Sequence, residues 1–221
     1  MNIFDILGPI MVGPSSSHTA GAVRIGAITR TLLGSTPSKA TIYLHGSFAA
    51  TGVGHGTDRA LVAGLLGMRP DDINIPNSFD IAKEKGLEVT FEHAEISGAH
   101  PNTAVLLVQS KDGKTMKVMA SSIGGGRIKV NEVDDTETNF SGENPTLIVN
   151  NQDRPGYVAQ ITAILSEHSI NIATMQLCRD KRGGDAVMVI EMDQKIKDEV
   201  LDQIKQLDGV EKATYIDATM D

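Results

Sequence analysis

Hydrophobic and polar positions repeat with two alternating periods in the last third of the chain. Apolar residues at every third or fourth position predict amphipathic helices, whereas short aliphatic runs bounded by turn residues predict strands. The Gly183-Gly184 pair between two such runs favours a hairpin turn. The predicted elements are a strand at 146–150, a helix opened by Pro155, strands at 170–177 and 186–192, a helix at 196–207 and a strand at 210–216. This part of the chain is therefore predicted to have the order βαββαβ.

The residues before position 134 show a less regular succession of the same patterns. The predicted helices are 19–33, 58–66 and 79–85. The predicted strands are 39–44, 87–92, 104–109, 116–120 and 128–133. Thr57 or Asp58 is expected to be the N-cap of the second helix. The predicted fold class is α/β (α+β), with a mixed α/β domain followed by the βαββαβ domain.

Residues 134–144, with the sequence DDTETNFSGEN, separate the two patterns. They contain no aliphatic side chain and are rich in acidic and small polar residues, which is typical of a solvated linker. We therefore predict an N-terminal domain over 1–133, a linker over 134–144 and a C-terminal domain over 145–221.

The composition argues against nucleic acid and anionic membranes as binding partners. With 20 Lys and Arg against 28 Asp and Glu, the chain has a net charge of -8 and offers no cationic surface for nucleic acid or an anionic membrane. Trp is absent, so platforms for stacking bases are not expected. No apolar run approaches the ~20 residues of a membrane-spanning helix, and the start MNIFDILGPI lacks the basic residues of a signal peptide. A small-molecule ligand, protein partners and a cytoplasmic location are expected.

The single cysteine, Cys178, limits the redox and metal chemistry that the chain can perform alone. One thiol excludes an intrachain disulfide and suits a reducing compartment. An iron-sulfur cluster normally takes about three or four thiolate ligands, so another chain would have to provide nearly all of them. The histidines show no HxxxH or HxH spacing, so no metal site is expected in this chain.

Three segments combine residue types that suit a ligand site. The first, 13–19, reads GPSSSHT and brings Ser15, Ser16, Ser17 and His18 to the start of a predicted helix. Backbone N–H groups and the positive end of the helix dipole favour a carboxylate or phosphate there. Helix capping alone needs one of these hydroxyls, so three serines followed by histidine predict a ligand-binding role.

The second segment, 46–58, reads GSFAATGVGHGTD and is predicted to be a loop between a strand and a helix. Its glycines would let the backbone approach a ligand closely, although no GxGxxG or GxxxxGK[ST] nucleotide motif is present. His55, between two glycines, is expected to be exposed, where it suits acid or base chemistry near neutral pH or is a bystander. The third segment is HPNT, 100–103, at the start of a strand, and this motif alone is not specific.

Together these segments resemble a known enzyme family. The beta part of the bacterial iron-sulfur-dependent L-serine dehydratases is similar in three stretches, NIFDILGPIMVGPSSSHTAGAVRIG, LHGSFAATGVGHGTDRA and HPNT. Family members often read SSHTVGPM where this chain reads SSHTAGAV, a difference that removes a proline and leaves the hydroxyl and imidazole groups in place. Over 146–217, with the turn DRPG before the first helix, the chain resembles the ferredoxin-like ACT domain, a ligand-sensing module of amino-acid enzymes.

The resemblance implies the beta subunit of an L-serine ammonia-lyase, which converts L-serine to pyruvate and ammonia by β-elimination. In this family the alpha subunit carries a 4Fe-4S cluster, and its open iron acts as a Lewis acid on the substrate hydroxyl. By similarity, the residues that hold or line the substrate site are Ser15, Ser16, Ser17, His18, His55, Thr57, His100 and Asn102. We favour His55 over His18 as the general base. The loops contain no lysine for a Schiff base, so pyridoxal phosphate is not expected.

The ACT resemblance implies an effector site where the loop after the first strand meets a neighbouring copy. The residues of that loop are Asn151, Asp153, Pro155 and Gly156. The alternative is that Asp153 and Gly156 only make the turn and cap the helix. ACT domains usually pair edge to edge, which implies self-association and, with the alpha subunit, a heteromer. The sequence leaves the effector open among serine, another amino acid and a monovalent cation.

A second interpretation is a non-catalytic, amino-acid-sensing regulatory module. Related α/β domains joined to ACT occur as the sensing part of some phosphoglycerate dehydrogenases. A pure sensor would not require the three histidines His18, His55 and His100, and their presence favours the dehydratase interpretation.

Overall fold

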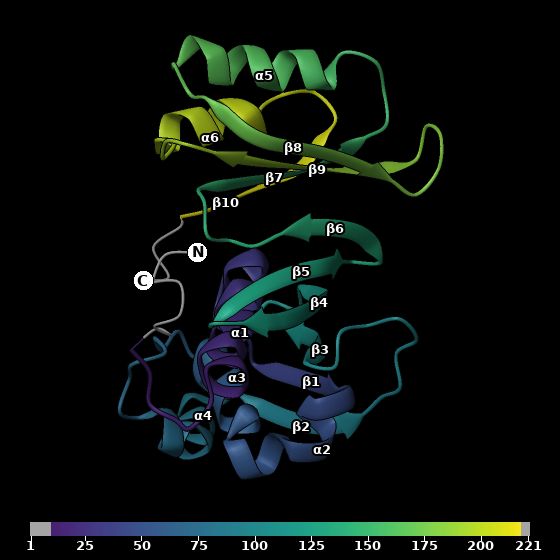
Figure 1. Cartoon of the computed structure of the whole chain (residues 1–221). Coiled ribbons are helices and arrows are strands. Elements are labelled where there is room, and N and C mark those ends of the chain that lie inside the picture. Colours follow the sequence, from purple (N-terminus) through teal and green to yellow (C-terminus); the bar gives the residue numbers. More distant parts are fainter. Residues whose placement is uncertain (1–9, 218–221) are drawn as a thin grey trace. The chain divides into compact units, whose positions relative to one another are not determined.

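The computed structural model describes residues 10–217, which form two compact units that divide between Asp135 and Thr136 (Figure 1). The strands of the first unit are β1 (Lys39–Leu44), β2 (Glu88–His93), β3 (Thr103–Gln109), β4 (Thr115–Gly124) and β5 (Arg127–Val133). Its helices and helical turns are η2 (Ser16–Ala20), α1 (Gly21–Leu33), α2 (Gly46–His55), α3 (Thr57–Leu65), η3 (Ile75–Asn77) and α4 (Ser78–Lys85). The strands lie in the order β2-β1-β3-β4-β5, with β1 parallel to β2 and antiparallel to β3.

Helices α1 and α3 pack against each other through their backbones. A Cβ atom on Gly26 would lie 2.2 Å from the Leu61 carbonyl oxygen, and one on Gly64 would lie 2.0 Å from the Val23 carbonyl oxygen. Only glycine permits so close an approach. Helix α1 also lies against β3, β4 and β5. Because α1 follows the serine segment and α3 follows α2, this contact holds two of the predicted ligand segments at a fixed separation.

Most elements of the first unit agree with the prediction. All five predicted strands are present, and the helix predicted over 19–33 begins as the π-helical turn η2 and continues as α1. The predicted N-cap of α3 is wrong. Gly56, in a left-handed conformation with φ 72°, precedes Thr57 and makes no side-chain cap. A glycine is favoured there because other residues rarely adopt this conformation.

The prediction of a loop over 46–58 is wrong for most of its length, because residues Gly46–His55 form helix α2. Glycine and β-branched residues have low helix propensity, which hides this helix in the sequence. Tertiary packing overrides that propensity. The Phe48 side chain is fully buried, and Gly52 lies so close to Thr57 that a Cβ atom on it would be 3.3 Å from the Thr57 Cβ.

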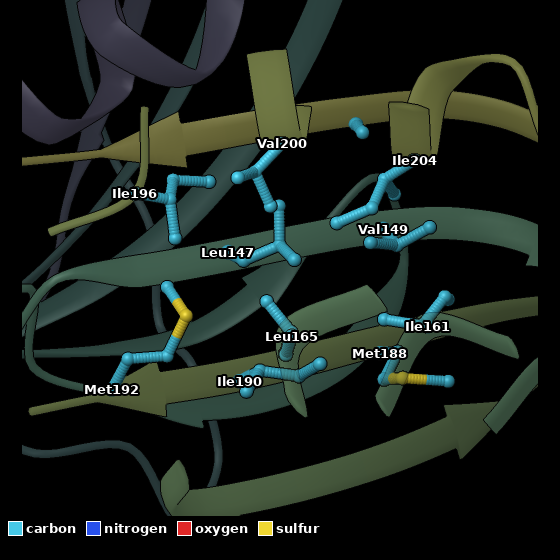
Figure 2. Close-up of a cluster of buried hydrophobic side chains, with 11 residues drawn as sticks. Leu147, Val149, Ile161, Leu165, Met188, Ile190, Met192, Ile196, Val200 and Ile204 are labelled. Carbon is cyan, nitrogen blue, oxygen red and sulfur yellow. The ribbon is translucent and has the colours of Figure 1, made fainter. Parts of the chain in front are cut away.

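From β7 on, the second unit confirms the predicted βαββαβ order. Its elements are β6 (Thr136–Phe140), β7 (Thr146–Gln152), α5 (Tyr157–Glu167), β8 (Ile172–Arg179), β9 (Asp185–Met192), α6 (Asp198–Lys205) and β10 (Val210–Ile216). Strands β10, β7, β9 and β8 form an antiparallel sheet in that order, and α5 and α6 lie side by side on one face of it (Figure 1). Apolar side chains between the helices and the sheet make the core (Figure 2), and they include Leu147, Val149, Ile161, Leu165, Met188, Ile190, Val200 and Ile204.

Part of the predicted linker is a strand. The expectation of a solvated segment over 134–144 is wrong for Thr136–Phe140, which forms β6 and lies against β8 and β9. Phe140 and Thr138 are buried, and the Gln176 amide donates a hydrogen bond to the Asn139 carbonyl oxygen at 2.7 Å. Threonine and phenylalanine favour strands, so this segment pairs and packs without any aliphatic residue.

Candidate active site around His18

The serine segment forms a capped turn before α1. Ser15 has an extended backbone with φ −143°, and its Oγ accepts a hydrogen bond from the His18 backbone N–H at 3.3 Å. The Gly21 N–H donates to the Ser16 carbonyl oxygen and closes the π-helical turn η2. Such turns are frequent at functional sites. The turn directs the His18 side chain inward, and only 8% of this residue is exposed.

Hydroxyl groups surround both ring nitrogens of His18. Nδ1 lies 3.1 Å from Ser17 Oγ and 3.4 Å from Ser15 Oγ. Nε2 lies 3.2 Å from Ser47 Oγ and 3.2 Å from Thr51 Oγ1. The imidazole therefore joins the serine turn to α2, two segments that are distant in the sequence.

Helix α2 presents one face to this imidazole. Ser47, Thr51 and His55 are spaced four residues apart, so their side chains lie on the same side of the helix. The exposed His55 ring has its centroid 4.9 Å from that of His18, and its Nδ1 lies 3.2 Å from the Thr51 carbonyl oxygen. Phe48 contacts the His18 ring edge-on, with the ring centroids 5.3 Å apart. The two predicted histidines are thus neighbours, one buried and one exposed.

The HPNT segment meets the start of α2 through its backbone. The Pro101 carbonyl oxygen accepts a hydrogen bond from the Ser47 N–H at 2.8 Å, and a Cβ atom on Gly46 would lie 2.7 Å from the same oxygen. The His100 ring is exposed, and its Nδ1 accepts a hydrogen bond from the Asn102 N–H at 3.1 Å. The structure therefore brings the HPNT backbone to the candidate site, whereas the contacts described for this imidazole stay within the segment.

The remaining predicted site residues are Ser16 and Thr57. Ser16 is half-buried on the serine turn, between Ser15 and Ser17. Thr57 is fully buried at the first position of α3, and its Oγ1 has no hydrogen-bond partner among the described residues. Its hydroxyl does not reach the surface, so the geometry gives no support to the predicted contact of Thr57 with a substrate.

Burial and the second histidine both act on the charge of His18. Desolvation lowers the pKa of the His18 imidazole below its ordinary value, and the nearby His55 lowers the pKa further by charge repulsion. A hydrogen bond with the Ser47 backbone raises the same pKa and is the weakest of the three causes. The net effect favours a neutral His18 at pH 7.

Sequence reasoning missed two residues of this cluster, Ser47 and Thr51. Both lie in the segment predicted to be a loop, where a side chain's direction cannot be inferred from its spacing. Once α2 is known to be a helix, the four-residue steps from Ser47 through Thr51 to His55 place all three on one face. That spacing is the signal that would have identified them.

The predicted effector loop of the second unit is arranged around its own turn. The Asp153 carboxylate accepts hydrogen bonds from the Gly183 N–H at 2.9 Å and from Arg179 Nη1 at 2.8 Å. These two contacts hold the pKa of the Asp153 carboxyl below its usual range. Pro155 and Gly156 are exposed, and Gly156 has φ 103° just before α5. Asp153 and Gly156 therefore make the turn.

Asn151 differs from the other residues of this loop. The residue is 3% exposed, and its Nδ2 donates a hydrogen bond to the Gln152 carbonyl oxygen at 2.7 Å. Its Oδ1 has no partner among the residues that the structure describes. An effector role for the loop stays a prediction.

Metal ligands are sparse in the part of the chain that the structure describes. Over residues 10–217, no group of three or more His, Cys, Asp or Glu side chains is arranged to bind a metal ion. Cys178 is a free, half-buried thiol on β8. One thiolate does not fit the ligand set of an iron-sulfur cluster. Over the same residues, no helix is both long and apolar enough to cross a membrane.

Comparison with known proteins identifies the family. Residues 2–85 match the family model for the serine dehydratase beta chain, and residues 146–209 match the ACT domain model. The probable L-serine dehydratase beta chain of Bacillus subtilis (strain 168) is 40% identical to this chain, over 97% of each chain. The chain belongs to the L-serine dehydratase beta-chain family. Its members include the L-serine dehydratase beta chain of Peptoniphilus asaccharolyticus, which is 34% identical, again over 97% of each chain.

A second group of relatives shares less of its length. The D-3-phosphoglycerate dehydrogenase of Methanocaldococcus jannaschii is 29% identical over 72% of this chain and 30% of its own length. Membership in the L-serine dehydratase beta-chain family confirms the family predicted from the three motifs. The ACT match confirms the predicted α+β fold class, with an ACT domain at the C-terminal end.

Proposed function

We propose that this chain is the beta subunit of an L-serine ammonia-lyase, which converts L-serine to pyruvate and ammonia in the cytoplasm. The observation that carries the proposal is the pair formed by a buried His18, surrounded by hydroxyls, and an exposed His55. The relatives named as L-serine dehydratase beta chains support the substrate. In the net reaction the α-carbon loses a proton and the β-carbon loses its hydroxide, which together leave as water. The resulting aminoacrylate then hydrolyses to pyruvate and ammonia.

His55 is the general base in this proposal. A carbonyl oxygen can only accept a hydrogen bond, so the 3.2 Å contact with the Thr51 carbonyl requires that Nδ1 of His55 carry the proton. In the neutral ring, Nε2 then has a free lone pair and can take the α-proton. His18 is less suited to this role, because hydroxyl groups already contact both of its ring nitrogens.

The serine turn holds the substrate carboxylate in this proposal. Ser15 and Ser16 bring hydroxyls to the start of η2 and α1, where backbone N–H groups favour an anion, and Ser17 lines the site beside them. His100 and Asn102 line the site from the HPNT segment, whose backbone is hydrogen-bonded to the start of α2.

The proposal assigns a 4Fe-4S cluster to a separate alpha subunit. The residues described in this chain do not fit such a cluster, because their one thiol, Cys178, provides at most one ligand. Assistance to the departing hydroxide is therefore a task of the alpha subunit. This chain binds and orients the amino acid and moves the α-proton. A pyridoxal phosphate enzyme is not proposed.

Anaerobic reconstitution tests the proposal directly. The chain is purified with and without the candidate alpha subunit, and pyruvate formation from L-serine is measured. We expect activity only in the complex, and full activity of this chain alone would refute the proposal. In the complex, His55→Ala should abolish exchange of the α-deuterium of labelled serine with solvent. Exchange at the normal rate would exclude His55 as the base.

A non-catalytic sensor is the second candidate function, and the match to a D-3-phosphoglycerate dehydrogenase supports it. A sensor would bind L-serine without forming pyruvate in any complex. Calorimetric titration of the chain with L-serine, run beside the pyruvate assay of the complex, separates the two functions.

Self-association through the second unit is part of the proposal. Strand β8 is an edge of the sheet, and Met175 and Leu177 on it are 42% and 46% exposed. An edge strand with apolar side chains is able to pair with a second copy. Leu177→Lys should therefore lower the mass measured by sedimentation equilibrium. The candidate effectors for the loop at 151–156 are serine, another amino acid and a monovalent cation.

A further inference from the structure

The hydroxyl of Thr51 determines which nitrogen of His18 carries a proton. Thr51 Oγ1 donates its hydrogen to the Ser47 carbonyl oxygen, one helical turn earlier, at 2.9 Å. A hydroxyl has a single hydrogen, so the side of Oγ1 that faces His18 Nε2 at 3.2 Å presents a lone pair. Two lone pairs would repel each other at this distance. The Ser47 hydroxyl, 3.2 Å from the same nitrogen, can donate or accept, so Thr51 is the contact that favours a hydrogen on Nε2 of His18.

The other nitrogen of this ring then has the opposite polarity. A neutral imidazole carries one N–H, so Nδ1 of His18 is an acceptor. The Ser17 hydroxyl, 3.1 Å away, donates its hydrogen to Nδ1. The Ser17 oxygen is consequently left with lone pairs only and can bind a ligand only as an acceptor. Ser15 Oγ accepts from the His18 backbone N–H and lies 3.3 Å from Ser17 Oγ and 3.4 Å from His18 Nδ1, so its own hydrogen is directed to one of these atoms or to a ligand.

The backbone of Thr51 acts on the second histidine. Its carbonyl oxygen accepts from Nδ1 of His55 at 3.2 Å, which fixes the hydrogen of that ring on Nδ1. One residue thus contacts both rings, through its side chain and its carbonyl, and it favours different tautomers in the two. Burial lowers the pKa of His18 and so favours the neutral ring, to which this tautomer argument applies, at pH 7.

We propose that Thr51 is a positioning residue that holds His18 as the Nε2–H tautomer and thereby makes Ser17 a hydrogen-bond acceptor for the ammonium group of an amino-acid substrate. The tautomer follows from contacts within the chain alone. The part that concerns the ammonium group rests on the proposed function. Recognition of a carboxylate falls to Ser15 and the first backbone N–H groups of the turn, because the N–H groups of His18, Thr19 and Gly21 already donate within it.

Nitrogen NMR of the isolated chain tests the tautomer. With 15N-labelled histidine at pH 7.5, long-range proton–nitrogen correlations distinguish Nε2–H from Nδ1–H, and His18→Gln and His55→Gln assign the signals. We expect Nε2–H for His18 in the unmodified chain and in Thr51→Ser. In Thr51→Val, which lacks the acceptor, we expect a shift towards Nδ1–H.

The wild-type spectrum alone can overturn the inference. Nδ1–H at His18 would do so, and so would an unchanged His18 tautomer in a folded Thr51→Val chain. If Thr51→Val does not fold, the wild-type and Thr51→Ser spectra decide. If Thr51 contributed only to packing, Thr51→Val would not change the tautomer of His18.

Ligand binding tests the polarity of Ser17. Calorimetry compares L-serine with 3-hydroxypropanoate, which keeps the carboxylate and the hydroxyl but lacks the amine. Ser17→Ala should weaken L-serine about tenfold, as expected for a hydrogen bond to a charged group, and leave 3-hydroxypropanoate unchanged. Equal weakening of both ligands would overturn the acceptor role. If the complex forms no pyruvate, the proposed function fails, but the tautomer result stands or falls independently.

Discussion

The cluster around His18 and the loop at 151–156 use polar side chains in different ways. In the first, hydroxyls from the serine turn and from α2 contact one imidazole from both sides. In the second, the Asp153 carboxylate binds Arg179 and a backbone N–H of the neighbouring β8–β9 turn. The first arrangement leaves the exposed His55 imidazole beside a buried ring, whereas the second links two turns through one carboxylate. Two segments rich in polar residues can thus both suggest a ligand site in the sequence, although in the structure one surrounds an imidazole and the other stabilises a turn.

Replacing His55 should have the largest effect and tests the catalytic side of this contrast. In the complex with the alpha subunit, His55→Gln should lower kcat by about 100- to 10,000-fold, because proton transfer by a positioned base contributes that much. His168→Gln, the same change in the second unit, is the control and should leave kcat within about twofold. A loss of less than tenfold at His55 would move the role of base to another residue.

Replacing Gly156 tests whether the loop of the second unit is mainly a turn. Gly156→Ala should lower the free energy of unfolding by about 1–2 kcal/mol, because φ 103° strains a residue that has a Cβ atom. Gly54→Ala is the control in α2, where no heavy atom lies within 4 Å of the added Cβ. That change should be neutral or stabilise by about 0.5 kcal/mol. Chemical denaturation measures both, and equal effects would contradict the assignment.

Replacing Ser15 should have a smaller effect on stability. Ser15→Ala removes the side chain that caps η2 and should cost about 1 kcal/mol, with faster hydrogen exchange over 15–33. Ser166→Ala, on an exposed position of α5, should cost nothing measurable. Unchanged exchange at 15–33 would show that the turn is held by other contacts.

The pH dependence of stability should separate the two regions most finely. Folding lowers the pKa of His18, so below its ordinary value of 6.5 the unfolded chain binds more protons and stability falls as the pH decreases towards the folded-state pKa. Folding also lowers the pKa of Asp153, and its contribution is present above 3.8 and is lost as the pH falls through the folded-state pKa. His18→Gln should therefore flatten the curve just below pH 6.5, and Asp153→Asn only below pH 3.8. An effect of His18→Gln only below pH 3.8, or of Asp153→Asn just below pH 6.5, would contradict these pKa shifts.

The strongly periodic parts of the fold could be predicted from the sequence. From β7 to β10, every strand and both helices of the second unit were expected within a few residues, because their apolar positions repeat without interruption. Helix α2 could not be predicted, since its stability comes from the burial of Phe48 and the packing of Gly52 rather than from local propensity. Strand β6 was hidden for a similar reason, because Thr138 and Phe140 are buried within a stretch of polar residues.

The candidate site could be predicted only in outline. His18 and His55 were recognised as residue types with a function, and the structure makes them neighbours. Ser47 and Thr51 were missed because their role depends on the helix that the sequence concealed. The direction of the His100 ring depends on a local hydrogen bond with the Asn102 N–H, and motif spacing carries no information about it.

The crossing of α1 and α3 has a consequence for how this family can change. Because no side chain separates the helices at Gly26 and Gly64, their distance is set by the radii of main-chain atoms. Substitutions elsewhere in the core alter the volume that side chains fill, but they do not act at this contact directly. A residue larger than glycine at either position would push the two helices apart, and with them the serine turn and α2.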